Sequence, residues 1–165
     1  MPVAPELFVA GMRLHAAGVT VVTTLHAGRP AGLTATSVCS VSAEPPQLLV
    51  CVNRAAEANA KIRTSRRFCV NVLAADQRAL ADRFAGRTGQ FGAARFAGAR
   101  WTRLLTGAPV LDGCRAAFDC RLADAVEAGT HTIFVGLVEA VAIRPDLAPL
   151  VYHEGEYGLV AHLPA

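Results

Sequence analysis

Short runs of apolar and β-branched residues dominate the first third of the chain and predict strands. Residues 19–25 (VTVVTTL) are β-branched apart from Leu25, and residues 33–41 (LTATSVCSV) follow the turn-like sequence Gly28-Arg29-Pro30. These two runs predict a hairpin in which 33–41 form one continuous strand. Residues 47–52 (QLLVCV), which follow a pair of prolines, have the composition of a short buried strand.

Helical patterns are few and short. Residues 6–17 place apolar side chains near helical spacing and end before a glycine, and residues 55–64 contain helix formers without a breaker. Residues 68–73 (FCVNVL) then alternate like a strand. Asp76 is a candidate cap for a further helix running to Phe84, after which the glycines of residues 86–92 predict an irregular loop suited to ligand contact.

The last third of the chain is mostly strand-like. Residues 114–126, 130–143 and 150–160 are separated by Gly129 and Pro145, and no domain boundary or internal repeat interrupts the chain. Six or more strands with two or three short helices predict a mainly β fold, a closed or nearly closed antiparallel barrel in one domain covering residues 1–165. A doubly wound parallel sheet fits this order poorly.

Composition narrows the class of protein. Hydrophobic residues make up 53% of the chain and the mean hydropathy is +0.36. The most apolar stretch, residues 133–143, is shorter than the ~18 residues that a membrane span needs and carries Glu139. No basic residue precedes Arg13, which disfavours a secretory signal. We therefore expect a cytoplasmic protein that buries its surplus apolar surface in a core and in a homodimer interface.

Charge and cysteine usage exclude several functions. The net charge of +3 comes from dispersed arginines, which disfavours nucleic-acid binding but suits phosphate-bearing ligands. The cysteines include no C-x-x-C pair and lie in apolar contexts, so we expect core residues rather than a zinc site, and Cys51 is the one candidate for a pocket thiol. The histidines have no ligand-like spacing, and we expect no metal site.

An ordered set of short segments resembles the short flavin reductases that supply two-component monooxygenases. The resemblance covers about residues 8–157 and rests on the order of its elements, because no single one is diagnostic. These elements are Gly18-Val19-Thr20-Val21-Val22-Thr23-Thr24, Gly32-Leu33-Thr34-Ala35-Thr36-Ser37, Ser40-Val41-Ser42, Pro45-Pro46, Ser65, residues 68–73, Gln77, Arg83-Phe84-Ala85-Gly86, Pro109-Val110-Leu111, Gly129-Thr130-His131 and Pro149-Leu150-Val151-Tyr152.

The resemblance implies an FMN-binding split β-barrel, a homodimer, and hydride transfer from NADH or NADPH to FMN or FAD, with the reduced flavin passing to a separate monooxygenase. It also implies three flavin-binding segments. Without the resemblance, residues 34–37 would be an ordinary threonine-rich strand and Asn53 a helix cap. Arg87 would be a surface arginine and Phe91 a core aromatic residue. The implied flavin-binding residues are Thr34, Ala35, Thr36, Ser37, Cys51, Val52, Asn53, Phe84, Arg87 and Phe91.

His131 is the candidate catalytic residue. It follows Gly129 at the start of a predicted strand, where the family usually has Gly-Asp-His and this chain has Thr130 in place of the aspartate. The resemblance places this histidine beside the nicotinamide and the flavin, where it would position the carboxamide or tune a proton. Two other functions stay open: a barrel flavoprotein that retains its FMN, and a non-enzymatic flavin-binding barrel.

Overall fold

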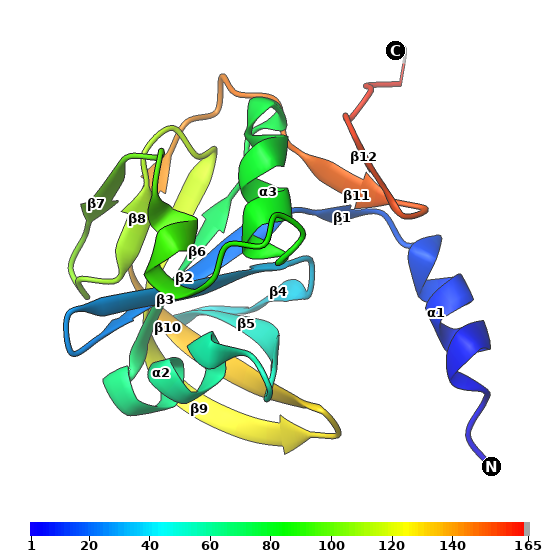
Figure 1. Cartoon of the computed structure of the whole chain (residues 1–165), viewed down its shortest axis with the longest axis horizontal. Coiled ribbons are helices and arrows are strands. Elements are labelled where there is room, and N and C mark those ends of the chain that lie inside the picture. Colours follow the sequence, from blue (N-terminus) through cyan, green and yellow to red (C-terminus); the bar gives the residue numbers. More distant parts are fainter. Residues whose placement is uncertain (164–165) are drawn as a thin grey trace.

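The main body of the protein is one curled antiparallel sheet (Figure 1). The structure is a computed structural model that describes residues 1–163. Seven strands pair in the order β3-β2-β6-β9-β10-β5-β4, and every neighbouring pair is antiparallel. Their bounds are β2 Thr20–His26, β3 Arg29–Ala35, β4 Val38–Ala43, β5 Pro46–Asn53, β6 Arg67–Val72, β9 Ala116–Ala128 and β10 His131–Ile143. The expected mainly β, antiparallel fold is confirmed.

The two edges of this sheet meet at Thr36 and Ser37. These two residues alone join β3, one edge strand, to β4, the other. Three extended backbone steps reach at most about 11 Å, so the sheet must curl until its edges almost touch. The prediction of one strand over residues 33–41 was wrong, because the chain leaves one edge after Ala35 and enters the opposite edge at Val38.

Apolar side chains pack on both faces of the central strands. On β2, Val22 joins the cluster around Val50, Phe68 and Phe134, whereas Val21 joins the cluster on the other face. Successive strand residues point to opposite faces, so a strand that is covered on both faces has apolar or β-branched residues at consecutive positions. Helix α2 (Glu57–Ser65) covers the first cluster through its fully buried Ile62.

The other helices are short and partly differ from the prediction. Helix α1 (Pro5–Arg13) ends four residues earlier than expected, and it buries none of its side chains. Asp76 does not cap a helix: it lies inside the 3-10 turn η1 (Ala75–Gln77), where the Gln77 Oε1 accepts a hydrogen bond from the Ala74 N–H at 2.9 Å. Helix α3 (Arg78–Phe84) follows directly, and the glycine loop (residues 86–92) leads into the 3-10 turn η2 (Gly92–Phe96).

Small strands complete the structure. The predicted strand over residues 150–160 is a short hairpin, β11 (Val151–His153) and β12 (Glu156–Gly158), which pairs with β1 (Ala17–Gly18). Strands β7 (Trp101–Arg103) and β8 (Pro109–Leu111) form a two-stranded sheet that the sequence did not predict. Asn71 of β6 holds β8 in place, because its buried Oδ1 accepts a hydrogen bond from the Leu111 N–H at 2.8 Å. Among residues 1–163, no helix is long and apolar enough to cross a membrane.

Candidate functional site

The corner between β3 and β4 opens into a cavity of about 450 Å³. Ser37 is exposed there and is held by a reciprocal pair of bonds to Cys51: the Ser37 Oγ–H donates to the Cys51 carbonyl at 3.0 Å, and the Cys51 N–H donates to the Ser37 carbonyl at 3.1 Å. Thr36, Ser37 and Cys51 line this first cavity on the sheet side, and side chains of α1 line it on the other. The strand-end segments that the resemblance implies therefore lie together.

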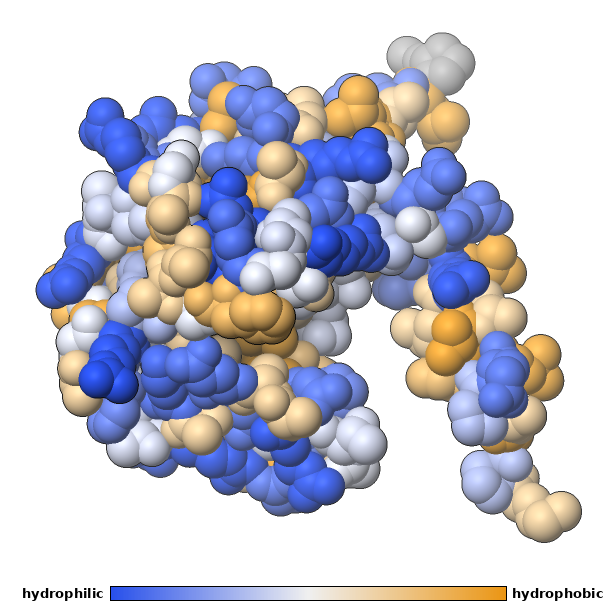
Figure 2. All heavy atoms as spheres, viewed as in Figure 1, coloured by the Kyte–Doolittle hydropathy of each residue, from blue (hydrophilic) through white to orange (hydrophobic). Residues whose placement is uncertain are grey.

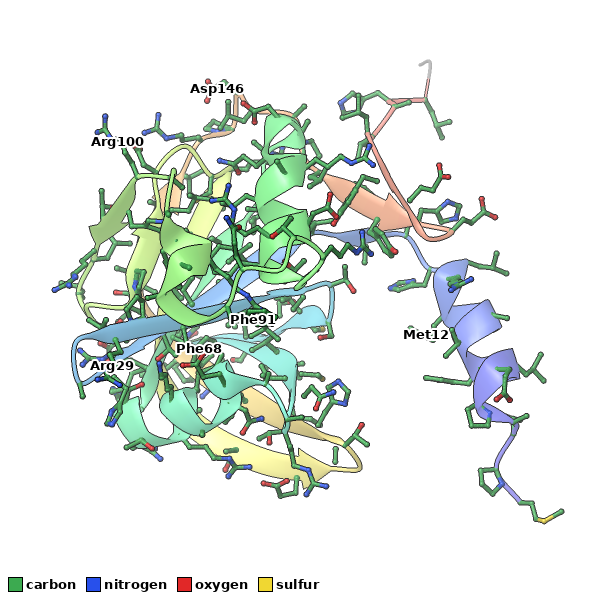
Figure 3. All side chains as sticks on the ribbon, viewed as in Figure 1. Met12, Arg29, Phe68, Phe91, Arg100 and Asp146 are labelled. Atoms are coloured by element: carbon green, nitrogen blue, oxygen red, sulfur yellow. The ribbon has the colours of Figure 1, made fainter. Side chains whose placement is uncertain are left out.

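A second cavity, of about 410 Å³, lies beside β3. Thr34 faces this cavity, and its Oγ–H donates to the Ala81 carbonyl at 2.6 Å. Phe91 of the glycine loop, labelled in Figure 3, also lines it and is 72% exposed. The segment from Thr34 to Ser37 thus borders both cavities, with Thr34 at the second and Thr36 and Ser37 at the first.

His131 and Asn53 meet at one end of the β5–β10 ladder, where they are directly paired. The Arg54 N–H donates to the Thr130 carbonyl at 3.0 Å and fastens the β9–β10 turn to the start of the α2 segment. The Thr130 hydroxyl lies 2.9 Å from the His131 Nδ1. This neutral hydroxyl occupies the position of the family aspartate, so it can orient the imidazole but adds no negative charge beside it.

The N-terminus of α2 adds an anion-binding feature next to Asn53. The Asn53 Oδ1 accepts a hydrogen bond from the Ala55 N–H at 2.9 Å, and the N-cap residue Ala56 supplies no side-chain acceptor to the first turn of the helix. Backbone N–H groups at an uncapped helix N-terminus attract phosphate groups. Arg54, whose side chain is 54% exposed, pairs with Glu127 at 3.3 Å on the same edge.

Four of the proposed flavin-binding residues lie where their side chains have other partners. Ala35 and Val52 are buried in the core. The Phe84 ring lines the second cavity but is only 1% exposed, because it packs edge-on against Phe96 and Trp101. Arg87 donates to the Asp82 carboxylate at 2.9 Å and to the Tyr152 hydroxyl at 3.3 Å, and these bonds raise the pKa of its guanidinium.

The sequence reasoning missed several residues of the second cavity. Arg95 donates to the Gly32 and Gln90 carbonyls at 3.3 and 3.0 Å, which ties the glycine loop to β3. Ala55, Ala56 and Glu57 line the same cavity. These three residues lie at the N-terminal end of the helix that the sequence predicted over residues 55–64, whereas Arg95 had no signal in the sequence.

The thiols divide into two groups. Cys69, Cys114 and Cys120 are buried, as expected, whereas Cys51 is half-buried and Cys39 is exposed, so the expectation of a core position was wrong for Cys39. Cys39 follows the β3–β4 corner at the sheet edge, where its side chain points away from the core. Burial raises the pKa of Cys114 to about 11 and of Cys120 to about 12, and it raises the pKa of Cys69 well above its usual value.

We expect at most two thiols to react with iodoacetamide in the native protein at pH 8. The three buried thiols are protected by inaccessibility and by their raised pKa values, since the thiolate is the reactive form. Mass spectrometry of native and urea-unfolded samples measures this, and unfolding should expose the remaining three sites. Native modification of Cys69, Cys114 or Cys120 would contradict their assignment to the core.

Comparison with known proteins identifies the family. Residues 12–161 match the family model described as "Flavin reductase like domain". The chain belongs to this family, which confirms the resemblance seen in the sequence. Among its relatives is the FMN reductase (NADH) RutF of Stutzerimonas stutzeri (strain A1501), which is 44% identical over 156 residues, covering 94% of this chain and 88% of that protein.

Solved structures agree with this assignment. A protein of Haemophilus somnus 129pt described as a flavin reductase has a TM-score of 0.92 at 35% identity, covering 96% of this chain and 100% of its own. BorF, the flavin reductase component of a bacterial two-component tryptophan halogenase, has a TM-score of 0.88 at 35% identity (97% and 100% covered). The Streptomyces globisporus C-1027 NADH:FAD oxidoreductase SgcE6, in complex with NAD and FAD fragments, has a TM-score of 0.85 at 32% identity, covering 98% of this chain and 97% of its own.

Proposed function

We propose that this protein is an NADH-dependent flavin reductase, which reduces FMN or FAD and releases the reduced flavin to a separate monooxygenase-type partner. The observation that carries the proposal is the convergence of the exposed Thr36–Ser37 corner, the Asn53–His131 pair and the open N-terminus of α2 in a member of this family. The names of RutF and SgcE6 support NADH and flavin as substrates, and that of BorF supports the two-component arrangement.

The residues present fit a flavin nucleotide. A flavin needs a phosphate site, polar groups for its pyrimidine edge and an apolar wall for its dimethylbenzene end. Arg54 and the first N–H groups of α2 suit the phosphate, and the hydroxyls and backbone of Thr36 and Ser37 suit the pyrimidine edge. Leu33 and Phe91, which line the second cavity, are available as the apolar wall.

Hydride transfer from NADH to the flavin is chemistry that the two nucleotides supply when bound. The task of the protein is therefore to bind both rings in reactive orientation and to exclude water. We assign His131 to the nicotinamide, because it lies at the strand end next to Asn53 while the Thr36–Ser37 corner serves the flavin. Thr130 fixes the orientation of its ring through the contact at Nδ1.

We also propose a homodimer. Helix α1 projects from the body (Figure 1), and apolar side chains are exposed on it (Figure 2). Leu7, Phe8 and Met12 are 67%, 61% and 51% exposed. Across the first cavity, the outer face of β5 and β10 is also apolar, with Ile133 paired to Cys51 and Val135 paired to Leu49. A second copy would cover both surfaces, and the free cysteines suit the reducing cytoplasm.

Replacing Leu7 and Phe8 together with serine should shift the protein from dimer toward monomer. Each side chain contributes on the order of 1.5–3 kcal/mol when buried, so loss of both from each copy should weaken association by well over 100-fold. Sedimentation equilibrium over a range of concentrations measures this. A matched control replaces Leu105, which is 76% exposed and lies outside α1, with serine. A monomeric wild-type protein at micromolar concentration would contradict the dimer.

Steady-state kinetics tests the proposed function. With NADH in excess, NADH oxidation should rise with added FMN or FAD and saturate, and it should be slow without flavin. Comparing NADH with NADPH and FMN with FAD ranks the four nucleotides. A protein that retains its flavin and turns over added flavin slowly would favour an electron-transfer flavoprotein, and one that binds flavin without oxidising NADH would leave only a binding barrel.

A further inference from the structure

A basic pocket lies at the opposite end of α2 from the candidate flavin site. Three arginines, Arg66, Arg67 and Arg121, line a cavity of about 270 Å³ together with Ser65, Thr106, Leu122 and Glu139. Three guanidinium groups against one carboxylate leave a net charge of +2 within the lining. Helix α2 has nine residues and is about 13 Å long, so this pocket is distinct from the one beside its N-terminus.

Each arginine is held in place by the fold and still has unused donors. Arg66 donates from Nη2 to the Leu122 carbonyl at 2.9 Å. Arg67 donates from Nη1 to the Thr106 carbonyl at 2.6 Å and from Nε to the Leu25 carbonyl at 3.3 Å. Arg121 donates from Nε to the Glu139 carboxylate at 2.7 Å. A guanidinium carries five N–H donors, so these contacts fix the groups without using them up. Fixed guanidinium groups with free donors are the residues that bind oxyanions best.

Arg66 and Arg67 also have a structural role, because cations at a helix C-terminus interact favourably with its dipole. That role does not explain Arg121, which comes from the middle of β9 and is oriented toward the same cavity. Among residues 1–163, the ion pair of Glu139 is with Arg121, on the adjacent strand. The pocket therefore contains one more arginine than the helix end requires.

We propose that this pocket is a binding site for a small phosphate dianion, separate from the flavin and nicotinamide sites. Its volume is below the ~300–1,000 Å³ typical of sites for drug-sized ligands, which suits an oxyanion rather than a whole nucleotide. Glu139 competes with the anion for Arg121, since its carboxylate occupies Nε and opposes the incoming charge. The proposal does not depend on the flavin reductase activity.

Two substitutions should change phosphate affinity in opposite directions. Arg121→Gln removes charge-assisted donors from an exposed strand position and should weaken phosphate binding about tenfold. Glu139→Gln removes the competing carboxylate and should strengthen it by about three- to tenfold. The melting temperature of the flavin-free protein, titrated with inorganic phosphate against chloride at constant ionic strength, reports binding because a native-state ligand stabilises the fold.

Two control variants separate this pocket from other sites. Arg100→Gln, at a side chain 87% exposed and outside the pocket, should leave the phosphate response unchanged. Arg54→Gln should lose flavin affinity but keep the part of the phosphate response that Arg121→Gln removes, and Arg121→Gln should keep NADH-dependent flavin reduction. Equal effects of phosphate and chloride on the wild-type protein, equal responses of the Arg121 and Arg100 variants, or weaker binding in Glu139→Gln would each overturn the proposal.

Discussion

Replacing Ser37 with leucine should weaken FMN binding by about 100-fold or more, equivalent to about 2.7 kcal/mol, while the protein stays folded. Ser37 is exposed at the β3–β4 corner, where its small side chain leaves the first cavity accessible. Leucine would fill the approach to the backbone and remove the hydroxyl that donates to the Cys51 carbonyl. The cost to stability should be limited to that one partly solvated hydrogen bond, about 1 kcal/mol.

Fluorescence titration of FMN measures this affinity, and the melting temperature of the flavin-free variant checks the fold. Ser40→Leu is the matched control, because Ser40 is exposed on β4 three residues away and lines neither cavity. It should bind FMN as the wild-type protein does. Normal FMN affinity in Ser37→Leu would show that the corner is only a connection between two strands.

Replacing His131 with alanine should leave flavin affinity nearly unchanged but slow NADH-dependent reduction by roughly 10- to 100-fold, about 1.4 to 2.7 kcal/mol. His131 is paired with Asn53, whereas Ser37 bonds to Cys51 two residues earlier on β5, so His131 should contact the second nucleotide more than the first. We expect the lower end of the range, because Thr130 orients the ring through a neutral hydroxyl rather than a carboxylate.

Two further variants test this assignment. His153→Ala, at a histidine on the exposed β11–β12 hairpin, should reduce flavin at the wild-type rate. Thr130→Ala retains the His131 ring but removes the contact at Nδ1, and it should cause a smaller loss than His131→Ala. Single-turnover reduction of pre-bound flavin measures both. An unchanged rate and unchanged NADH dependence in His131→Ala would make His131 a structural residue.

The sequence predicted the strands that side-chain pattern alone determines. The β-branched run of β2 is buried on both faces of the sheet, and its composition reflects that burial directly. The apolar run of β5 buries only alternate side chains, and Leu49 and Cys51 on its outer face are half-buried. The break at Thr36–Ser37 was not predictable in this way, because residues 33–41 are strand-like throughout and only closure of the sheet separates β3 from β4. Strand β8 was missed for a similar reason, since its position depends on Asn71 of β6.

The predicted residues of the candidate site also fall into two groups: those that strand pairing positions and those that depend on tertiary packing. The order of short segments was enough to bring Ser37, Cys51, Asn53 and His131 together, because strand pairing then places them side by side. Phe84 and Arg87 depend on tertiary partners that no local pattern encodes: an aromatic cluster with Phe96 and Trp101 for the ring, and Asp82 and Tyr152 for the guanidinium. The contribution of Arg95 depends likewise on how the glycine loop packs against β3.

Anaerobic single-turnover reduction tests the central claim most directly. The protein is loaded with one equivalent of FMN, mixed rapidly with NADH, and followed by the loss of the flavin's visible absorbance. A flavin reductase should bleach the flavin completely in one exponential phase, at a rate that rises to saturation with NADH concentration and far exceeds that of free FMN with NADH. Bleaching no faster than free FMN under the same conditions would contradict the assigned activity.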